Sequence, residues 1–187
     1  MKRLVIVVVW LCSSAICLAQ SKGEFQGLYH RVEGLTYNSG SPLLFDIEGA
    51  STNGGGYAIA YNLSDNFGVY QQMGFFGGVS QNGYGVRLIT EMQGFRVTTN
   101  SGPIDLYAKF GLGITNWSFS GYLSGSSTNF GINYGSGAEI KMTEGLYLVL
   151  EASRLTTRMP NITDLPGRTG WDSSWLFSTG VAIHWGQ

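Results

Sequence analysis

Residues 104–114 alternate apolar and polar side chains without a break. Even positions carry Leu106, Ala108, Phe110, Leu112 and Ile114, and odd positions carry Asp105, Tyr107, Lys109, Gly111 and Gly113. Successive side chains of a strand point to opposite faces, so one face is apolar and the other is polar and charged. Such a strand is typical of a barrel with lipid outside and a polar interior. Residues 130–142 repeat the pattern, which predicts a transmembrane β-barrel.

The chain contains about eight runs of this kind, an even number, as in bacterial outer-membrane barrels. We expect strands near 25–37, 56–63, 67–78, 84–97, 104–117, 129–142, 146–156 and 175–185. Their connectors alternate in length. Short turn-forming links at 63–66, 98–103 and 143–145 alternate with segments rich in Gly, Ser, Thr and Asn at 38–55, 118–128 and 157–174, together with the shorter 78–83. The predicted fold class is therefore all-β, an eight-stranded antiparallel up-and-down transmembrane β-barrel with periplasmic turns and outer loops.

The N-terminal segment has the three parts of a secretory signal peptide. Lys2 and Arg3 precede an apolar stretch, and small residues end at Ala19, which predicts a signal peptide over 1–19 and an outer-membrane barrel domain over 20–187. The apolar stretch is shorter than the ~20 residues that a spanning helix needs. Both cysteines, Cys12 and Cys17, lie inside the predicted signal peptide, so the mature chain has no thiol.

Charge and hydropathy narrow the function classes. The chain carries 11 basic and 12 acidic residues without a basic patch, which argues against a nucleic-acid partner. Since no segment after residue 19 is suited to a spanning helix, membrane insertion requires strands closed into a barrel.

Three segments carry a more specific resemblance. YAIAYNLSDNFGV (57–69), LYAKFGLGI (106–114) and YGSGAEIKMTEGLYL (134–148) resemble the strand-turn-strand units of small outer-membrane barrels similar to the transmembrane domain of outer-membrane protein A and to opacity proteins. The resemblance covers nearly all of the mature chain. It implies export through the periplasm to the bacterial outer membrane, with lipid, lipopolysaccharide, the barrel-assembly machinery and an unknown extracellular ligand as partners. Two features depart from the resembled family: Gly186 and Gln187 follow the terminal aromatic residue Trp185, and we expect no periplasmic domain after the last strand.

Strand parity predicts a charged interior. The expected lumen network consists of Arg31, Glu33, Arg87, Glu91, Lys109, Glu139, Lys141 and Glu151. Folding about the 98–103 turn places positions that sum to about 200 opposite each other, which predicts a Glu91–Lys109 pair. Eight strands leave little space inside, so we expect a filled interior and no wide pore. In the resembled family interior salt bridges can rearrange, which implies a possible minor ion conductance.

The outer face is predicted from the same parity. Leu106, Phe110, Leu112, Ile132, Ile140, Leu148, Leu150 and Val181 should face lipid. Aromatic residues favour the membrane–water interface, and the expected girdle comprises Trp117, Tyr122, Trp171 and Trp175 at the outer rim and Trp185 at the periplasmic rim. Gly113 should face inward, where we expect a substitution to be milder than a charge at Leu112.

The two histidines, His30 and His184, show no nucleophile–base pair in reach, so no catalytic residue is expected, and neither a cofactor nor a metal site. We expect a structural and surface-contact role through the long loops, which hold Asp46, Glu48, Tyr122, Arg158, Asp164, Arg168 and Trp171. Two alternatives remain: a lipid A-modifying outer-membrane enzyme, and a soluble secreted lipocalin-like ligand-binding barrel with an apolar interior and polar exterior.

Overall fold

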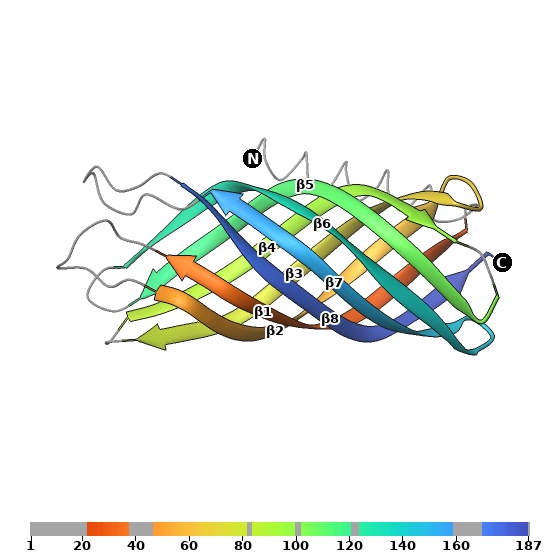
Figure 1. The fold of residues 1–187 in the computed structure, drawn as a ribbon, viewed down its shortest axis with the longest axis horizontal. Coiled ribbons are helices and arrows are strands. Elements are labelled where there is room, and N and C mark those ends of the chain that lie inside the picture. Colours follow the sequence, from red (N-terminus) through yellow and green to blue (C-terminus); the bar gives the residue numbers. More distant parts are fainter. Residues whose placement is uncertain are drawn as a thin grey trace, which may run out of the picture.

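The computed structural model describes residues 22–37, 47–81, 84–99, 102–120, 124–158 and 170–186. These residues form the strands β1 Gly23–Tyr37, β2 Ile47–Asn62, β3 Phe67–Gln81, β4 Tyr84–Thr98, β5 Ile104–Ser120, β6 Gly125–Thr143, β7 Leu146–Arg158 and β8 Trp171–Trp185 (Figure 1). No helix among the described residues is long and apolar enough to cross a membrane. The predicted signal peptide lies outside the described residues.

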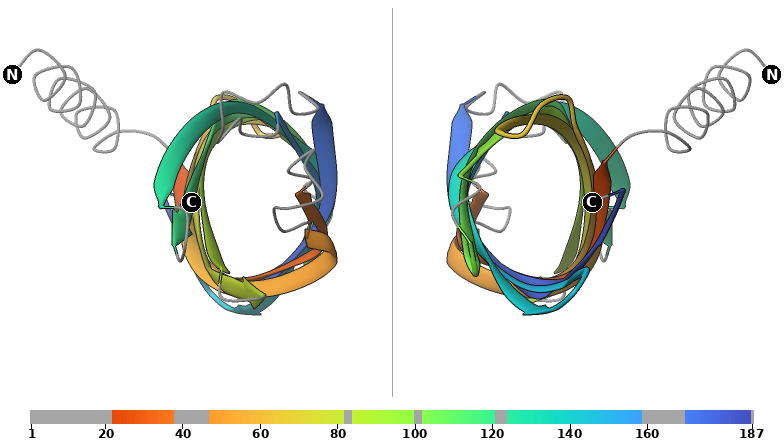
Figure 2. Two further views of the ribbon diagram at one scale, coloured as in Figure 1. Left: turned by 90° about the vertical axis from the view of Figure 1, so that its left-hand side faces the viewer. Right: turned by 90° about the vertical axis from the view of Figure 1, so that its right-hand side faces the viewer.

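The eight strands close into one antiparallel barrel in sequence order. Each strand pairs with the next, and β1 pairs with β8 over most of its length, from Gly23 opposite Trp185 to Glu33 opposite Trp175. The end-on views show the resulting ring (Figure 2). Closure leaves no unpaired sheet edge, which is the condition for strands to cross a bilayer. The predicted fold class is confirmed.

One end of the barrel, here called the turn side, holds the short links at 63–66, 99–103 and 144–145. In the first link the Phe67 amide donates to the Ser64 hydroxyl at 3.1 Å, and the Asn66 side chain donates to the Thr98 carbonyl at 2.9 Å. In the two-residue link Gly145 has φ 77°, a conformation that favours glycine. The opposite end, with the connections 38–46, 82–83, 121–124 and 159–170, is called the loop side.

The strands are longer on the loop side than predicted. β2 begins at Ile47, β5–β6 pairing continues to Phe119 opposite Gly125, and β7–β8 pairing continues to Arg158 opposite Trp171. The expected loops at 38–55, 118–128 and 157–174 are therefore partly strand. Their Gly-, Ser- and Thr-rich sequences pair through the backbone, but they lack the apolar alternation from which a strand can be predicted.

The outer face carries a continuous apolar band. Its large side chains are exposed on the isolated chain, and they include Phe25, Phe67, Phe75, Ile89, Phe95, Leu106, Phe110, Leu112, Ile114, Phe130, Leu150, Phe177 and Val181. On β5 the outward residues change to Asn116, Ser118 and Ser120 toward the loop side. Soluble proteins rarely expose an apolar surface of this extent, so the band indicates lipid contact and argues against the lipocalin-like alternative.

Gly113 faces inward as predicted, and it lies against the backbone of the neighbouring strand. A Cβ at Gly113 would lie 1.8 Å from the backbone oxygen of Glu91 on β4. Gly113→Ala is therefore expected to lower the free energy of unfolding by about 1–3 kcal/mol, because the added methyl group must displace backbone. Urea unfolding of the folded barrel in detergent measures the change.

Gly27→Ala is the matched control, since an added Cβ there meets nothing within 4 Å. Alanine is preferred to glycine inside a strand, so this control should be neutral or slightly stabilising. Equal losses of stability in the two variants would contradict the steric explanation.

Candidate functional site

The barrel interior is layered along its axis. Next to the loop side lies an apolar layer of inward residues, here called the loop-side layer: Val32, Leu35, Phe76, Val86, Leu88, Met92, Trp117, Phe119, Leu155 and Leu176. All of them are buried, and Trp117 and Val32 are completely inaccessible. The expected interior was polar throughout, and this layer corrects it. These side chains pack together as one buried apolar cluster inside the barrel.

Below this layer lies a central network around Lys109. The Lys109 ammonium is 2.7 Å from Glu151 Oε2 and donates to Gln72 Oε1 at 2.6 Å. The Tyr107 hydroxyl donates to the same Glu151 oxygen at 3.0 Å, and the Tyr70 ring lies 5.2 Å from the ammonium. The charges of Lys109 and Glu151 are therefore paired and hydrogen-bonded, as buried charges require.

Glycines on β6 allow this contact between β5 and β7, which are not neighbours. Lys109 pairs with Gly135 and Tyr107 with Gly137 in the β5–β6 register. A Cβ at Gly137 would lie 2.5 Å from the Tyr107 ring, so the tyrosine lies directly over that glycine. The absence of side chains at these two positions lets the β5 side chains reach Glu151 across β6.

A second cluster, the turn-side network, consists of Glu24, Arg96, Glu139 and His184. The Arg96 guanidinium forms ion pairs with Glu24 Oε1 and, at 2.9 Å, with Glu139 Oε1. His184 Nε2 lies 3.2 Å from Glu24 Oε2 and 3.2 Å from Glu139 Oε2. Both carboxylates thus present one oxygen to Arg96 and the other to His184.

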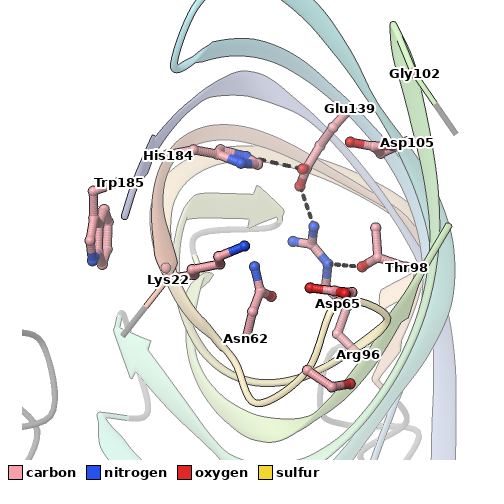
Figure 3. Close-up of a pocket in the computed structure, with 12 residues that line it drawn as sticks. Lys22, Asn62, Asp65, Arg96, Thr98, Gly102, Asp105, Glu139, His184 and Trp185 are labelled. Carbon is pink, nitrogen blue, oxygen red and sulfur yellow. Dashed lines mark hydrogen bonds and ion pairs between the residues drawn. The ribbon is translucent and has the colours of Figure 1, made fainter. Parts of the chain in front are cut away.

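Neighbouring side chains hold the turn-side network in place. Gln26 donates to Glu24 Oε1 at 2.6 Å and to Glu139 Oε1 at 3.0 Å, and Arg96 Nε donates to Thr98 at 3.0 Å. The Arg96 guanidinium lies 4.4 Å from the Tyr107 ring, which connects this network to the central one. A cavity of about 320 Å³ borders the network on the turn side, and Figure 3 shows Arg96, Glu139 and His184 beside Lys22, Asn62, Asp65 and Asp105.

The structure places three of the eight predicted lumen residues in these networks, namely Lys109, Glu139 and Glu151. The prediction is wrong for the other five residues, which do not belong to the lumen networks. Arg31 and Glu33 pair with each other at 2.6 Å on the outer face, with side chains 48% and 46% exposed. Arg87 is exposed on the outer face, Glu91 accepts a hydrogen bond from outward-facing Gln71 at 3.2 Å, and Lys141 is exposed near the end of β6.

Strand register explains the β4 error and the failure of the predicted Glu91–Lys109 pair. On β4–β5 paired positions sum to 205, with Arg96 opposite Lys109 and Glu91 opposite Ile114. Because this sum is odd, inward odd positions on β5 face inward even positions on β4. A one-residue difference in register exchanges the two faces of a strand. The inward charge of β4 is Arg96 and not Arg87 or Glu91.

Sequence reasoning missed Glu24, Arg96 and His184. Glu24 precedes the predicted start of the first strand, and His184 was considered only as part of a catalytic set. Arg96 stands between Phe95 and Val97, both of which face outward, so the local alternation at 95–97 could have identified it.

The predicted aromatic girdle is partly corrected. Trp171 and Trp175 are exposed on the outer face, and Trp175 stacks on Phe177 with ring centres 6.1 Å apart. Trp185 is half-buried at the turn-side end of β8. Trp117 faces inward because its parity on β5 is odd, and it belongs to the loop-side layer. Tyr122 lies outside the described residues.

The interior also contains a serine–histidine contact that was not expected. His30 Nδ1 lies 2.8 Å from Ser178 Oγ, and Ser178 donates to Glu151 at 3.4 Å. In a catalytic triad the histidine lies between the serine and the carboxylate. Here Ser178 lies between them, and both His30 and Ser178 are buried in the lumen. The arrangement is thus a structural hydrogen-bond chain.

A closed eight-stranded barrel with an apolar outer band and a charged, filled interior defines a small outer-membrane protein. The family model described as "Outer membrane protein beta-barrel domain" matches residues 8–180. The chain belongs to this family, which places the protein in the bacterial outer membrane.

Solved structures share the fold at low sequence identity, and 31 chains match. Neisserial surface protein A (NspA) is 11% identical with a TM-score of 0.62, covering 86% of this chain and 96% of its own. The N-terminal barrel domain of Pseudomonas aeruginosa OprF is 15% identical with a TM-score of 0.56, covering 89% and 98%. Ail of Yersinia pestis, the attachment invasion locus protein, is 14% identical with a TM-score of 0.53, covering 88% and 99%. No curated protein matches the sequence.

Proposed function

We propose that this protein is a closed outer-membrane barrel that acts through its loop side, as a structural and surface-contact protein. The observation that carries the proposal is the loop-side layer. Trp117, Leu88 and Leu155 are buried at 2% exposure or less inside the barrel, next to the loop side. An apolar filling of this kind gives neither water nor ions a path, which argues against the minor ion conductance. Function is then expected at the outer surface.

The outer face of the barrel is polar at the loop side. The β5–β6 ladder extends past the apolar band with outward Ser118, Ser120, Ser126 and Thr128. Arg158 and Trp171, two of the expected contact residues, pair at the end of β7–β8 and are exposed. Glu48 lies in β2, whereas Asp46, Tyr122, Asp164 and Arg168 lie outside the described residues. Exposed polar side chains with an aromatic anchor, held on a rigid frame, suit contact with an extracellular ligand.

Outward arginines support lipopolysaccharide as the surrounding lipid. Arg31, Arg87 and Arg158 are exposed, and on the outer face each lies on the loop side of the outward apolar residues Tyr29, Ile89 and Leu150 of its own strand. Guanidinium groups bind phosphate strongly, and lipopolysaccharide carries phosphate near the membrane surface. The predicted signal peptide over 1–19 and the barrel-assembly machinery would supply the export route.

The enzymatic alternative finds less support. The Ser178–His30 contact is sealed inside the barrel, so a lipid substrate could not reach the hydroxyl. Catalysis needs a nucleophile and base within reach of the substrate. The proposal is accordingly that the protein is not an enzyme.

Replacing the loop-side connections tests the proposal. Residues 38–46, 121–124 and 159–170 are each exchanged for an Asn-Gly turn. The barrel should still fold, since its stability comes from the closed strand ladder, while binding of intact cells to host surfaces or ligands should be lost. Heat-modifiable electrophoretic mobility measures folding, and adhesion of intact cells measures binding.

The matched control keeps the length and composition of each connection but scrambles its order. Binding that depends on specific contacts should be lost in this control too, with normal mobility. Unfolding after the exchange, or adhesion equal to the wild-type chain after all three replacements, would refute the assignment of function to the loop side.

A further inference from the structure

The turn-side network brings together three side chains that suit a metal ion. One oxygen of Glu24, one oxygen of Glu139 and Nε2 of His184 all lie within 4.8 Å of one another. They come from β1, β6 and β8, so the barrel closure assembles them. We propose that Glu24, Glu139 and His184 bind one divalent transition-metal ion of the Zn(II) class at the turn side of the lumen.

The distances fit such an ion. His184 Nε2 is 3.2 Å from each of the two carboxylate oxygens. Zinc binds nitrogen and oxygen at about 2.0–2.2 Å, so two ligands at a tetrahedral angle are separated by roughly 3.3 Å. An ion between the three atoms therefore needs only small side-chain movements.

The two oxygens that face this point have no other hydrogen bond among the described residues. Glu24 Oε2 and Glu139 Oε2 belong to carboxylates that are 1% and 0% exposed, and the group that faces both oxygens among the described residues is His184 Nε2, 3.2 Å from each. The other oxygen of each carboxylate accepts from Arg96 and Gln26. The single N–H that His184 Nε2 can carry cannot satisfy two buried carboxylate oxygens fully, whereas a bound cation would satisfy both at once.

The net charge of the turn-side network also favours binding of a cation. Two carboxylates face one guanidinium in this cluster, so with a neutral imidazole the cluster carries one excess negative charge. A divalent ion would reverse that excess and coordinate all three ligands. The competing occupant is a proton on His184, which would balance the charge without metal.

Surrounding groups would hold the ligands in a binding orientation. The Tyr147 ring stacks on the His184 imidazole with centres 4.0 Å apart and planes 20° apart. Arg96 and Gln26 fix the two carboxylates. Such outer contacts orient metal ligands and raise affinity.

The adjoining cavity provides access from the turn side, and Glu139 and His184 are among the residues that line it (Figure 3). Three protein ligands leave a further position for water or another ligand, as in open zinc sites. One imidazole with two carboxylates favours Zn(II), Co(II) or Mn(II) over the all-oxygen ligation that Ca²⁺ and Mg²⁺ prefer.

The test uses the mature barrel without a histidine tag, folded in detergent and freed of metal with a chelator. Co(II) is titrated and followed by visible absorption, and Zn(II) binding is measured by calorimetry. We expect one ion per chain, a Co(II) spectrum that Zn(II) abolishes, and loss of affinity by at least about 100-fold in His184→Gln and in Glu139→Gln. Heat-modifiable mobility checks that each variant is folded.

Glu33→Gln is the matched control, because it removes an exposed carboxylate on the outer face and should leave binding unchanged. If a ligand variant does not fold, the ligands are identified instead by X-ray absorption spectroscopy of the Zn(II)-loaded wild-type chain. The spectrum should show one imidazole among oxygen ligands. Absence of saturable 1:1 binding, unchanged binding in both ligand variants, or a zinc spectrum without imidazole would overturn the proposal.

Discussion

Lys109→Met is expected to lower the free energy of unfolding by about 3–5 kcal/mol, because it leaves the carboxylate of Glu151 buried without its cation. In the folded barrel the two side chains are 3% and 2% exposed and 2.7 Å apart. Among the described residues, the hydrogen-bond donors that would remain to the carboxylate are the neutral hydroxyls of Tyr107, Ser153 and Ser178. Urea unfolding in detergent, followed by mobility and tryptophan fluorescence, measures the loss.

The double variant Lys109→Met/Glu151→Gln should recover most of this stability, since replacing both members of a buried pair is often nearly neutral. The double-mutant cycle should therefore show a coupling of at least about 2 kcal/mol. Lys109→Met/Glu91→Gln is the control for the pair predicted from sequence, because Glu91 lies on the outer face. Additive effects at Lys109 and Glu151, or coupling with Glu91 instead, would contradict the observed network.

Leu112→Arg is expected to cost about 2–4 kcal/mol of folding stability, the penalty for a charge near the middle of the lipid-facing surface. Leu112 faces outward between Phe110 and Ile114, and it pairs with Gln93 and Ile132 on the neighbouring strands. The change in unfolding free energy should be measured in lipid vesicles, where the outer face is in contact with hydrocarbon.

Ser126→Arg is the matched control on the adjacent strand β6. Ser126 is exposed on the loop side of the apolar band and pairs with Ser118, so an arginine there should change stability by less than about 1 kcal/mol. A loss at Ser126 equal to the loss at Leu112 would contradict the position of the band.

The sequence alone determined the fold and the faces of several strands. On β5 the alternation from Leu106 to Ile114 is uninterrupted, and the structure has each of these residues on the expected side. The alternation within β6 and β7 likewise predicted that Glu139 and Glu151 face inward, and both are buried inside the barrel. These features are local, because the direction of a side chain depends only on its parity within its own strand.

Only the tertiary structure decided which charges meet. The β4–β5 register sets Arg96, and not Glu91, opposite Lys109, and barrel closure carries Glu24 and His184 to Glu139. Lys109 reaches Glu151 across the glycines of β6. Trp117, expected in the girdle, lies in the loop-side layer. Lumen contacts join strands distant in sequence, and a shift of one residue between two strands exchanges their faces, so no local pattern specifies them.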